Sequence, residues 1–172
     1  MLTAVVCVLA GYLLGSIPTA YLLTRAFARK DIRLENEGNV GARNALRAAG
    51  PIAAILTLSL DIGKGAAASL LAQSLTATPL PVYLTGLSVI LGHGFPIWLG
   101  WHGGKGLAAA AGYLLALWPA DTVIALAVLL GVRAVTPVFD LAVAAAAVTF
   151  LILSFWQRRG ASDVAFFIAL MV

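Results

Sequence analysis

The chain has 172 residues, of which 62% are hydrophobic and 10% are charged, and its net charge is +4. A soluble domain is about 45–50% apolar and about 25% charged, so this chain folded in water would expose too much apolar surface. The composition therefore excludes a soluble enzyme, a disordered chain and a basic nucleic-acid-binding protein. Cys7 is the one cysteine. It allows neither a disulfide framework nor a zinc site, and we expect it to act as a small apolar residue.

Long apolar runs predict an all-α integral membrane helical bundle, organised as a single domain over residues 1–172. A membrane-spanning helix needs about 20 mostly apolar residues. We expect about seven helical segments, over residues 2–24, 52–75, 82–99, 107–117, 119–132, 137–156 and 164–172. The run Gly15-Ser16-Ile17-Pro18 is expected to kink the first segment, because proline disrupts a helix interior. The N-terminal run has no basic start and no small-residue cleavage site, so we do not expect it to be a cleaved signal peptide.

Basic side chains gather between the first two predicted spans, at Arg25, Arg29, Lys30, Arg33, Arg43 and Arg47. Cytoplasmic loops of membrane proteins carry an excess of lysine and arginine. We therefore expect this segment in the cytoplasm. Counting spans places Lys105 and Arg133 on the same side, and Arg158 and Arg159 on the other.

A glycine-rich turn, Gly103-Gly104-Lys105-Gly106, stands directly before a predicted helix. Such a turn presents backbone N–H groups, the helix N-terminus adds partial positive charge, and the lysine adds a full charge. Phosphate is the natural ligand of that set. A plain tight turn between helices is an equally good interpretation, because the P-loop pattern is incomplete here.

A second cationic segment runs over residues 38–47, where Asn39, Gly41 and Asn44 indicate turns and available hydrogen-bonding groups. Arg43 and Arg47 are four residues apart, so they share one face of a helix. An arginine fork suits phosphate oxygens. The alternative is a basic anchor that touches lipid headgroups.

Ionisable residues that could take part in chemistry fall inside the second and third predicted spans, at Asp61, Lys64 and His93. Asp61 and Lys64 are spaced i, i+3 and can pair on one helix. Ionisable groups in a membrane face a cavity or a partner, so a structural ion pair and a substrate contact are both consistent with the spacing. By residue type His93 is a candidate base or hydrogen-bond donor, and a histidine with a purely structural role is the alternative.

Three motifs in chain order carry a resemblance to a known family. They are Gly15-Ser16-Ile17-Pro18, the run over residues 38–47, and Leu91-Gly92-His93-Gly94-Phe95-Pro96 followed by the 103–106 turn. Leu60-Asp61 and Lys64-Gly65 also fit. Over about residues 11–112 the chain resembles the PlsY family, bacterial membrane glycerol-3-phosphate acyltransferases that use acyl phosphate.

The resemblance implies a multi-pass protein of the bacterial cytoplasmic (inner) membrane, with its active site facing the cytoplasm. It implies transfer of a fatty acyl group from acyl phosphate to the sn-1 hydroxyl of glycerol 3-phosphate, giving lysophosphatidic acid and phosphate in phospholipid synthesis. No cofactor, metal or nucleic acid is expected, and the partners are the two substrates and membrane lipid.

The residue assignments follow from the motifs. Lys105, Arg47 and His93 are the expected catalytic residues. The expected phosphate-binding residues are Gly103, Gly104, Gly106, Asn39, Gly41 and Asn44. Ser16, Asp61, Lys64 and Thr136 are further candidates for substrate contact.

The chain departs from the family pattern at two places that bear on the acceptor. Glu37 stands where the family usually has serine, and the family's late His-x-x-Asn motif does not occur in residues 158–172. Two alternatives therefore stay open. One is a relative that acylates another hydroxyl acceptor or only binds acyl phosphate. The other is a small transporter with Asp61 and Lys64 along its path.

Overall fold

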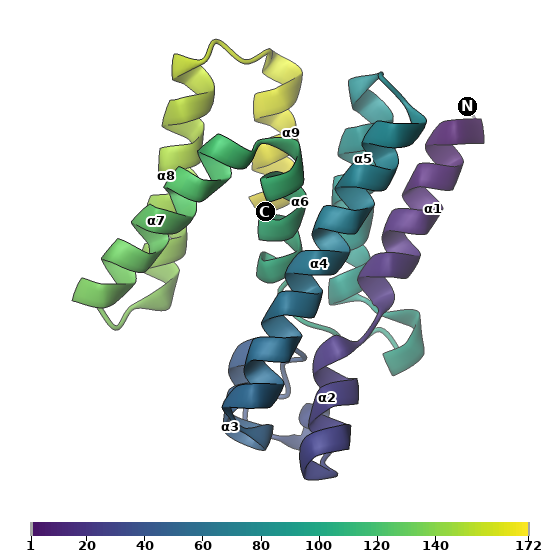
Figure 1. Cartoon of the computed structure of the whole chain (residues 1–172), viewed down its shortest axis with the longest axis vertical. Helices are drawn as coiled ribbons and strands as arrows, with labels where there is room; N and C mark the ends of the chain where they lie inside the picture. Colours follow the sequence, from purple (N-terminus) through teal and green to yellow (C-terminus); the bar gives the residue numbers. More distant parts are fainter. Residues whose placement is uncertain (1, 172) are drawn as a thin grey trace. The chain divides into compact units, whose positions relative to one another are not determined.

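The computed structural model describes residues 2–171, and every regular element in that range is a helix (Figure 1). The chain forms two compact units, one extending to Tyr113 and the other beginning at Leu114. The first unit holds α1 (Leu2–Ser16), α2 (Thr19–Ala28), η1 (Ile32–Leu34), α3 (Ala42–Ala49), α4 (Pro51–Leu75), α5 (Pro79–Gly94), η2 (Ile97–Leu99) and the first part of α6 (Leu107–Leu117). The second holds the rest of α6, α7 (Pro119–Val135), α8 (Phe139–Trp156) and α9 (Ala161–Met171).

The predicted all-α membrane bundle is confirmed. Within residues 2–171, four helical stretches are long and apolar enough to cross a membrane: Leu2–Ala28, Pro51–Leu75, Pro79–Leu99 and Phe139–Trp156. Each predicted segment contains a helix, with four differences in detail. The first segment is broken at residues 17–18 into α1 and α2, and the third is broken at residues 95–96 between α5 and η2. The sixth begins at Phe139, and α3 is an additional short helix in the polar segment.

Glycines let α1 and α5 approach closely. A Cβ on Gly15 would run into the backbone of Val89, and a Cβ on Gly92 would run into the Tyr12 carbonyl. Small residues are the usual means of bringing membrane helices together, because apolar burial gives no drive between them in lipid. Cys7 is fully buried in α1, consistent with its expected role as a small apolar residue. The result is a tight helix pair that ends at the Gly15–Pro18 break.

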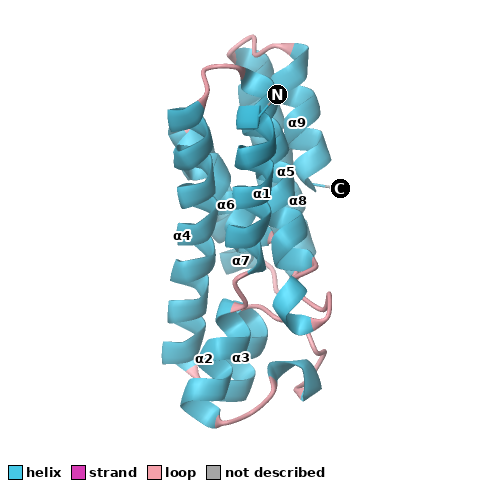
Figure 2. Ribbon diagram, turned by 90° about the vertical axis from the view of Figure 1, so that its right-hand side faces the viewer, coloured by secondary structure: helices cyan, strands magenta, loops and turns pink. Residues whose placement is uncertain are grey.

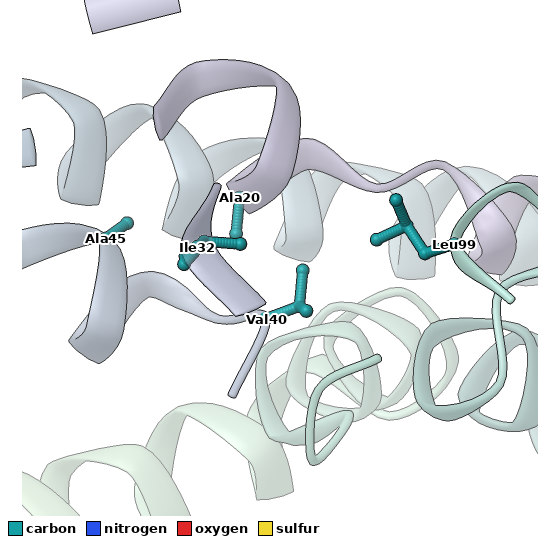
Figure 3. Packing of buried hydrophobic residues seen from close by; sticks show 5 residues of the cluster. All are labelled: Ala20, Ile32, Val40, Ala45 and Leu99. Carbon is teal, nitrogen blue, oxygen red and sulfur yellow. The ribbon is translucent and has the colours of Figure 1, made fainter. Parts of the chain in front are cut away.

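The helices α2 and α3 lie together at the end of the first unit where α1 stops (Figures 1 and 2). Pro18 has no backbone N–H and ends the hydrogen-bonding pattern of α1. Beyond the break, a small apolar cluster joins the elements at this end, and Figure 3 shows its side chains converging. Its members are Ala20 of α2, Ile32 of η1, Val40 of the following loop, Ala45 of α3 and Leu99 of η2. The cluster thus packs the polar segment against α2 and against η2, the short helix that follows α5.

The second unit has its own polar contact among aromatic rings. Asp121, buried near the start of α7, accepts hydrogen bonds from Gln157 and Arg159, which follow α8. The Arg159 guanidinium lies 4.4 Å from the centroid of the Trp118 ring. Arg159, one of the two basic residues at 158–159, therefore forms an ion pair with Asp121. Counting the charges in loops could not predict this partner.

Candidate active site

A buried ion pair lies beside the helix break. Lys64 Nζ and Asp61 Oδ1 are 2.8 Å apart on α4, and both residues are buried, with relative exposures of 7% and 1%. Asp61 Oδ1 also accepts a hydrogen bond of 2.6 Å from the Thr19 hydroxyl. Lys64 donates to the Ile17 carbonyl at 3.1 Å. The Ile17 carbonyl also accepts from the Thr19 N–H at 3.0 Å, so the pair connects α4 to the backbone at the break.

His93 lies next to this ion pair at the end of α5. Its Nδ1 is 3.6 Å from Asp61 Oδ1 and is buried without a hydrogen-bond partner among the described residues. The other ring nitrogen, Nε2, faces the glycine turn, because a Cβ built on Gly104 would collide with it. The imidazole therefore stands between the ion pair of α4 and the turn at residues 103–106.

The glycine turn packs directly against the end of α5. The Gly104 N–H donates to the His93 carbonyl at 3.1 Å, so this amide is engaged within the chain. A Cβ on Gly103 would collide with the His93 and Gly94 carbonyls. Gly106 has a φ of +77°, a conformation that favours glycine, and its carbonyl accepts from Ala110 in the first turn of α6. Close packing therefore explains Gly103 and Gly104, and the left-handed backbone explains Gly106.

The two cationic segments predicted from the sequence meet at this turn. The Val40 N–H donates to the Gly103 carbonyl at 3.3 Å, which joins residues 38–47 to residues 103–106. A small cavity of about 10 Å³ lies next to Val40, beside the helix break. Its lining includes Pro18, Thr19, Val40, Lys64, His93 and Pro96. Motifs far apart in the sequence thus share one small volume in the first unit.

Asn44 organises the loop before α3. It is buried, and its Nδ2 lies 2.9–3.1 Å from the carbonyl oxygens of Ile32, Glu35 and Asn39. Its Oδ1 accepts from Asn36 at 2.8 Å. The side-chain amide that we expected to contact phosphate is therefore occupied by the backbone.

Two other expected phosphate ligands lie in the same loop. Asn39 and Gly41 are both partly exposed, and the Gly41 N–H donates to the Asn39 carbonyl at 3.1 Å. A Cβ on Gly41 would lie 3.0 Å from Asn39 Nδ2. Contact between these two residues and a phosphate stays a prediction.

Two cationic side chains stand at the exposed rim of the site. Arg47 Nη1 donates to Glu37 Oε1 at 2.5 Å, and both side chains are exposed. That hydrogen bond holds the pKa of the Glu37 carboxyl below its ordinary value, and the charges of Arg47 and Arg43 act in the same direction. Lys105 is exposed, and within residues 2–171 no hydrogen bond or ion pair holds its side chain. The rim therefore presents one free ammonium and one guanidinium that already has a carboxylate partner.

The remaining candidates are Ser16 and Thr136. Ser16 is fully buried, and its hydroxyl has no hydrogen-bond partner among the described residues. Thr136 belongs to the second unit, where its carbonyl accepts from Arg133 at 3.0 Å. Substrate contact by either residue stays a prediction. Sequence reasoning missed Thr19, whose signal was a hydroxyl directly after the proline that breaks the first span.

The chain is similar to known proteins both in family and in sequence. Residues 5–172 match the family described as glycerol-3-phosphate acyltransferase. The protein of that name from Rhodospirillum rubrum is 47% identical over 122 residues, which cover 66% of this chain and 56% of the relative. The one from Jannaschia sp. is 48% identical over 112 residues, covering 64% and 55%. The chain thus spans just over half the length of these curated relatives.

Solved structures agree with the family match. A crystal structure described as PlsY, an integral membrane glycerol 3-phosphate acyltransferase in its glycerol 3-phosphate form, has a TM-score of 0.86 and 31% identity. The match covers 98% of this chain and 84% of the chain in that crystal structure. The lysophosphatidic acid form of the same protein has a TM-score of 0.87 and 30% identity, with the same coverage. Since the family match extends over residues 5–172, the chain belongs to the glycerol-3-phosphate acyltransferase family.

Proposed function

We propose that this protein transfers a fatty acyl group from acyl phosphate to the sn-1 hydroxyl of glycerol 3-phosphate. The products are lysophosphatidic acid and inorganic phosphate. The observation that carries the proposal is the hydrogen bond from Val40 to Gly103, which brings the Arg47 segment to the Lys105 turn in one unit. Two phosphate-bearing substrates need two cationic segments at one reaction centre, and family membership supplies the acceptor.

The chemistry needs no covalent acyl-enzyme. The acceptor hydroxyl oxygen forms a bond to the acyl carbonyl carbon, and the bond from that carbon to the bridging phosphate oxygen breaks. Its electron pair leaves on phosphate, and the hydroxyl proton passes to a phosphate oxygen. Lys105 and the 103–106 turn stabilise the leaving phosphate, while Arg47 holds the second anionic group. Rate then comes from positioning and charge stabilisation.

The cytoplasmic side of a bacterial inner membrane is the proposed location. Arg25, Arg29, Lys30, Arg33, Arg43 and Arg47 all belong to the polar segment or to the end of α2 that leads into it. Excess basic residues mark cytoplasmic loops. The same side supplies water-soluble glycerol 3-phosphate, while the acyl chain of the donor stays in the lipid.

The direct test uses the purified full chain in nanodiscs. With a long-chain acyl phosphate and glycerol 3-phosphate, we expect lysophosphatidic acid and phosphate in equal amounts. Acyl-CoA in place of acyl phosphate should give no product. Absence of lysophosphatidic acid from the acyl phosphate reaction would overturn the proposal, and equal rates with acyl-CoA would overturn the assigned donor.

A matched pair of lysine variants tests the phosphate role of the turn. Lys105→Ala should lower turnover by about 100-fold or more, the usual effect of removing a group that stabilises developing charge. Lys30→Ala removes another exposed lysine, one that is 3.1 Å from Glu35, and should leave turnover within about twofold. Equal rates for Lys105→Ala and the unaltered protein would remove Lys105 from the reaction.

One observation favours a second candidate, acylation of a different hydroxyl acceptor. Arg47 is already paired with Glu37 at 2.5 Å, so a second phosphate would meet a carboxylate at this guanidinium. An acceptor panel distinguishes the two functions. Faster acylation of glycerol than of glycerol 3-phosphate at equal concentration would favour the second.

A further inference from the structure

The Glu37–Arg47 pair has the geometry of an occupied anion site. Glu37 Oε1 lies 2.5 Å from Arg47 Nη1, and the two side chains are 63% and 40% exposed. A carboxylate and a phosphate offer a guanidinium the same oxygen acceptors. The residue that would hold an anionic substrate is therefore bound to an anion from its own chain.

The backbone presents Glu37 on a braced turn. Glu37 lies between Asn36, at a φ of +50°, and Gly38, at a φ of +68°. The Gly38 N–H donates to the Glu35 carbonyl at 2.9 Å, and the buried Asn44 amide lies 3.0 Å from the same carbonyl. Such a turn delivers the Glu37 side chain to the rim at a low entropic cost, because its backbone is already ordered.

We propose that Glu37 is a specificity-determining residue, whose carboxylate competes with the phosphate group of the acceptor for Arg47. The proposal rests on the proposed function, in which glycerol 3-phosphate is that acceptor. In the empty site Glu37 holds the guanidinium, and binding of the acceptor displaces it. The carboxylate therefore weakens binding of anionic acceptors and leaves neutral ones unaffected.

Exposure makes the displacement feasible. An ion pair in water contributes little to stability, since both charges are well solvated when apart. A phosphate can engage the arginine fork with two oxygens, whereas the structure shows one Glu37 oxygen at one Arg47 nitrogen. Because Arg47 holds the Glu37 pKa below its ordinary value, the competing carboxylate stays ionised wherever a phosphate monoester is a dianion, above about pH 6.

The experiment compares Glu37→Gln with Glu35→Gln in the full chain. Glu35 is two residues away and pairs with Lys30 at 3.1 Å, so its variant removes the same charge from the same segment without touching Arg47. We expect Glu37→Gln to lower the KM for glycerol 3-phosphate about two- to fivefold at unchanged kcat, the range of an exposed ion pair. Glu35→Gln should leave both constants unchanged. Glu37→Ala should reproduce the Glu37→Gln effect, which assigns it to loss of the carboxylate.

Calorimetric binding of glycerol 3-phosphate, with glycerol as the neutral probe, separates this proposal from the reaction itself. If no variant turns over but Glu37→Gln binds glycerol 3-phosphate more tightly, the competition stands and the proposed function fails. If turnover is present and the KM of Glu37→Gln equals that of the unaltered protein, the competition fails and the proposed function stands. Three other results would also overturn the competition. They are an equal gain in glycerol 3-phosphate affinity for Glu35→Gln, an equal gain in glycerol affinity for Glu37→Gln, and no binding of glycerol 3-phosphate by any variant.

Discussion

Two ion pairs in the first unit differ in almost every physical respect. Asp61 and Lys64 are buried on a spanning helix, and their partners include Thr19 and the Ile17 carbonyl. Glu37 and Arg47 stand in water at the rim, and their ion pair is a single short contact. The first pair cannot separate without leaving a charge in a low-dielectric interior, while the second can exchange partners at little cost.

The contrast shows which part of the site is rigid and which part can exchange ionic partners. Lys64 donates to the Ile17 carbonyl next to Pro18, so the buried pair holds α4 to the helix break. His93 Nδ1 lies 3.6 Å from the same carboxylate, so the imidazole connects the buried pair to the glycine turn. The rim charges, Lys105 and Arg47, are the groups that we propose meet soluble ligands, and neither is buried.

The largest effect on stability is expected from removing one charge of the buried pair. Lys64→Met leaves the Asp61 carboxylate buried without its cation, and we expect a loss of about 3–5 kcal/mol in the free energy of unfolding. Glu37→Gln, which splits the exposed pair, should leave that free energy nearly unchanged. Both are measured by titrating the protein in mixed micelles with a denaturing detergent.

An apolar double variant provides the control. Asp61→Leu combined with Lys64→Met removes both charges and should recover most of the stability, because an apolar pair has no desolvation cost. Recovery of fold without recovery of turnover would show that the pair positions His93. A loss below about 1 kcal/mol for Lys64→Met alone would contradict the structural role of the pair.

The next effect comes from the buried amide of the polar segment. Asn44→Ala removes the group that lies within 3.1 Å of three carbonyl oxygens, and we expect a loss of about 2 kcal/mol. Since the Glu37 turn depends on the same amide, turnover should fall as well. Asn36→Ala is the matched control, because that side chain is exposed and makes a single hydrogen bond, to Asn44 Oδ1. Equal losses for the two variants would contradict the organising role of Asn44.

The glycine turn allows a smaller and more local test. Gly104→Ala would place a methyl group against His93 Nε2 and the Val40 carbonyl, and should cost about 1–3 kcal/mol through overpacking. Gly63→Ala is the control, since a Cβ there meets nothing within 4 Å and alanine favours a helix. We expect Gly63→Ala to be neutral or stabilising in the same unfolding titration. A neutral Gly104→Ala would show that the turn does not pack on His93 as described.

Sequence reasoning predicted the features that local pattern determines. Apolar runs located the helical segments, Pro18 located the break, and i, i+3 spacing proposed the pairing of Asp61 with Lys64. Each of these depends on residues within a turn or two of one another. The family resemblance, which rests on ordered motifs, is confirmed by the match over residues 5–172.

Partners from distant segments could not be predicted in this way. Asn44 looked like a ligand because an amide can bind phosphate or backbone equally well, and only the fold brings three carbonyls to it. The Gly104 amide was expected to face an anion, yet tertiary packing pairs it with His93. Thr19 gained its role only when α4 came alongside the break. Residue type sets what a side chain can bind, and topology decides which partner is near.

The smallest expected effect extends the comparison to a third pair, Asp31 with Arg33. The Arg33 side chain donates to both carboxylate oxygens, at 3.0 and 2.7 Å, and this hydrogen bonding lowers the pKa of Asp31. Because the folded-state pKa lies below the unfolded value, the stabilisation is present above about pH 4 and is lost as the pH falls through the folded pKa. We expect amide exchange in η1 to accelerate in that acidic range, because the free energy of local opening falls there by less than about 1 kcal/mol. Asp31→Asn should remove this pH dependence, while Glu35→Gln should retain it. The exchange rate of the unaltered chain, corrected for intrinsic exchange, could instead be independent of pH. Exposed pairs in this segment would then contribute nothing to stability, and the buried pair alone would be structural.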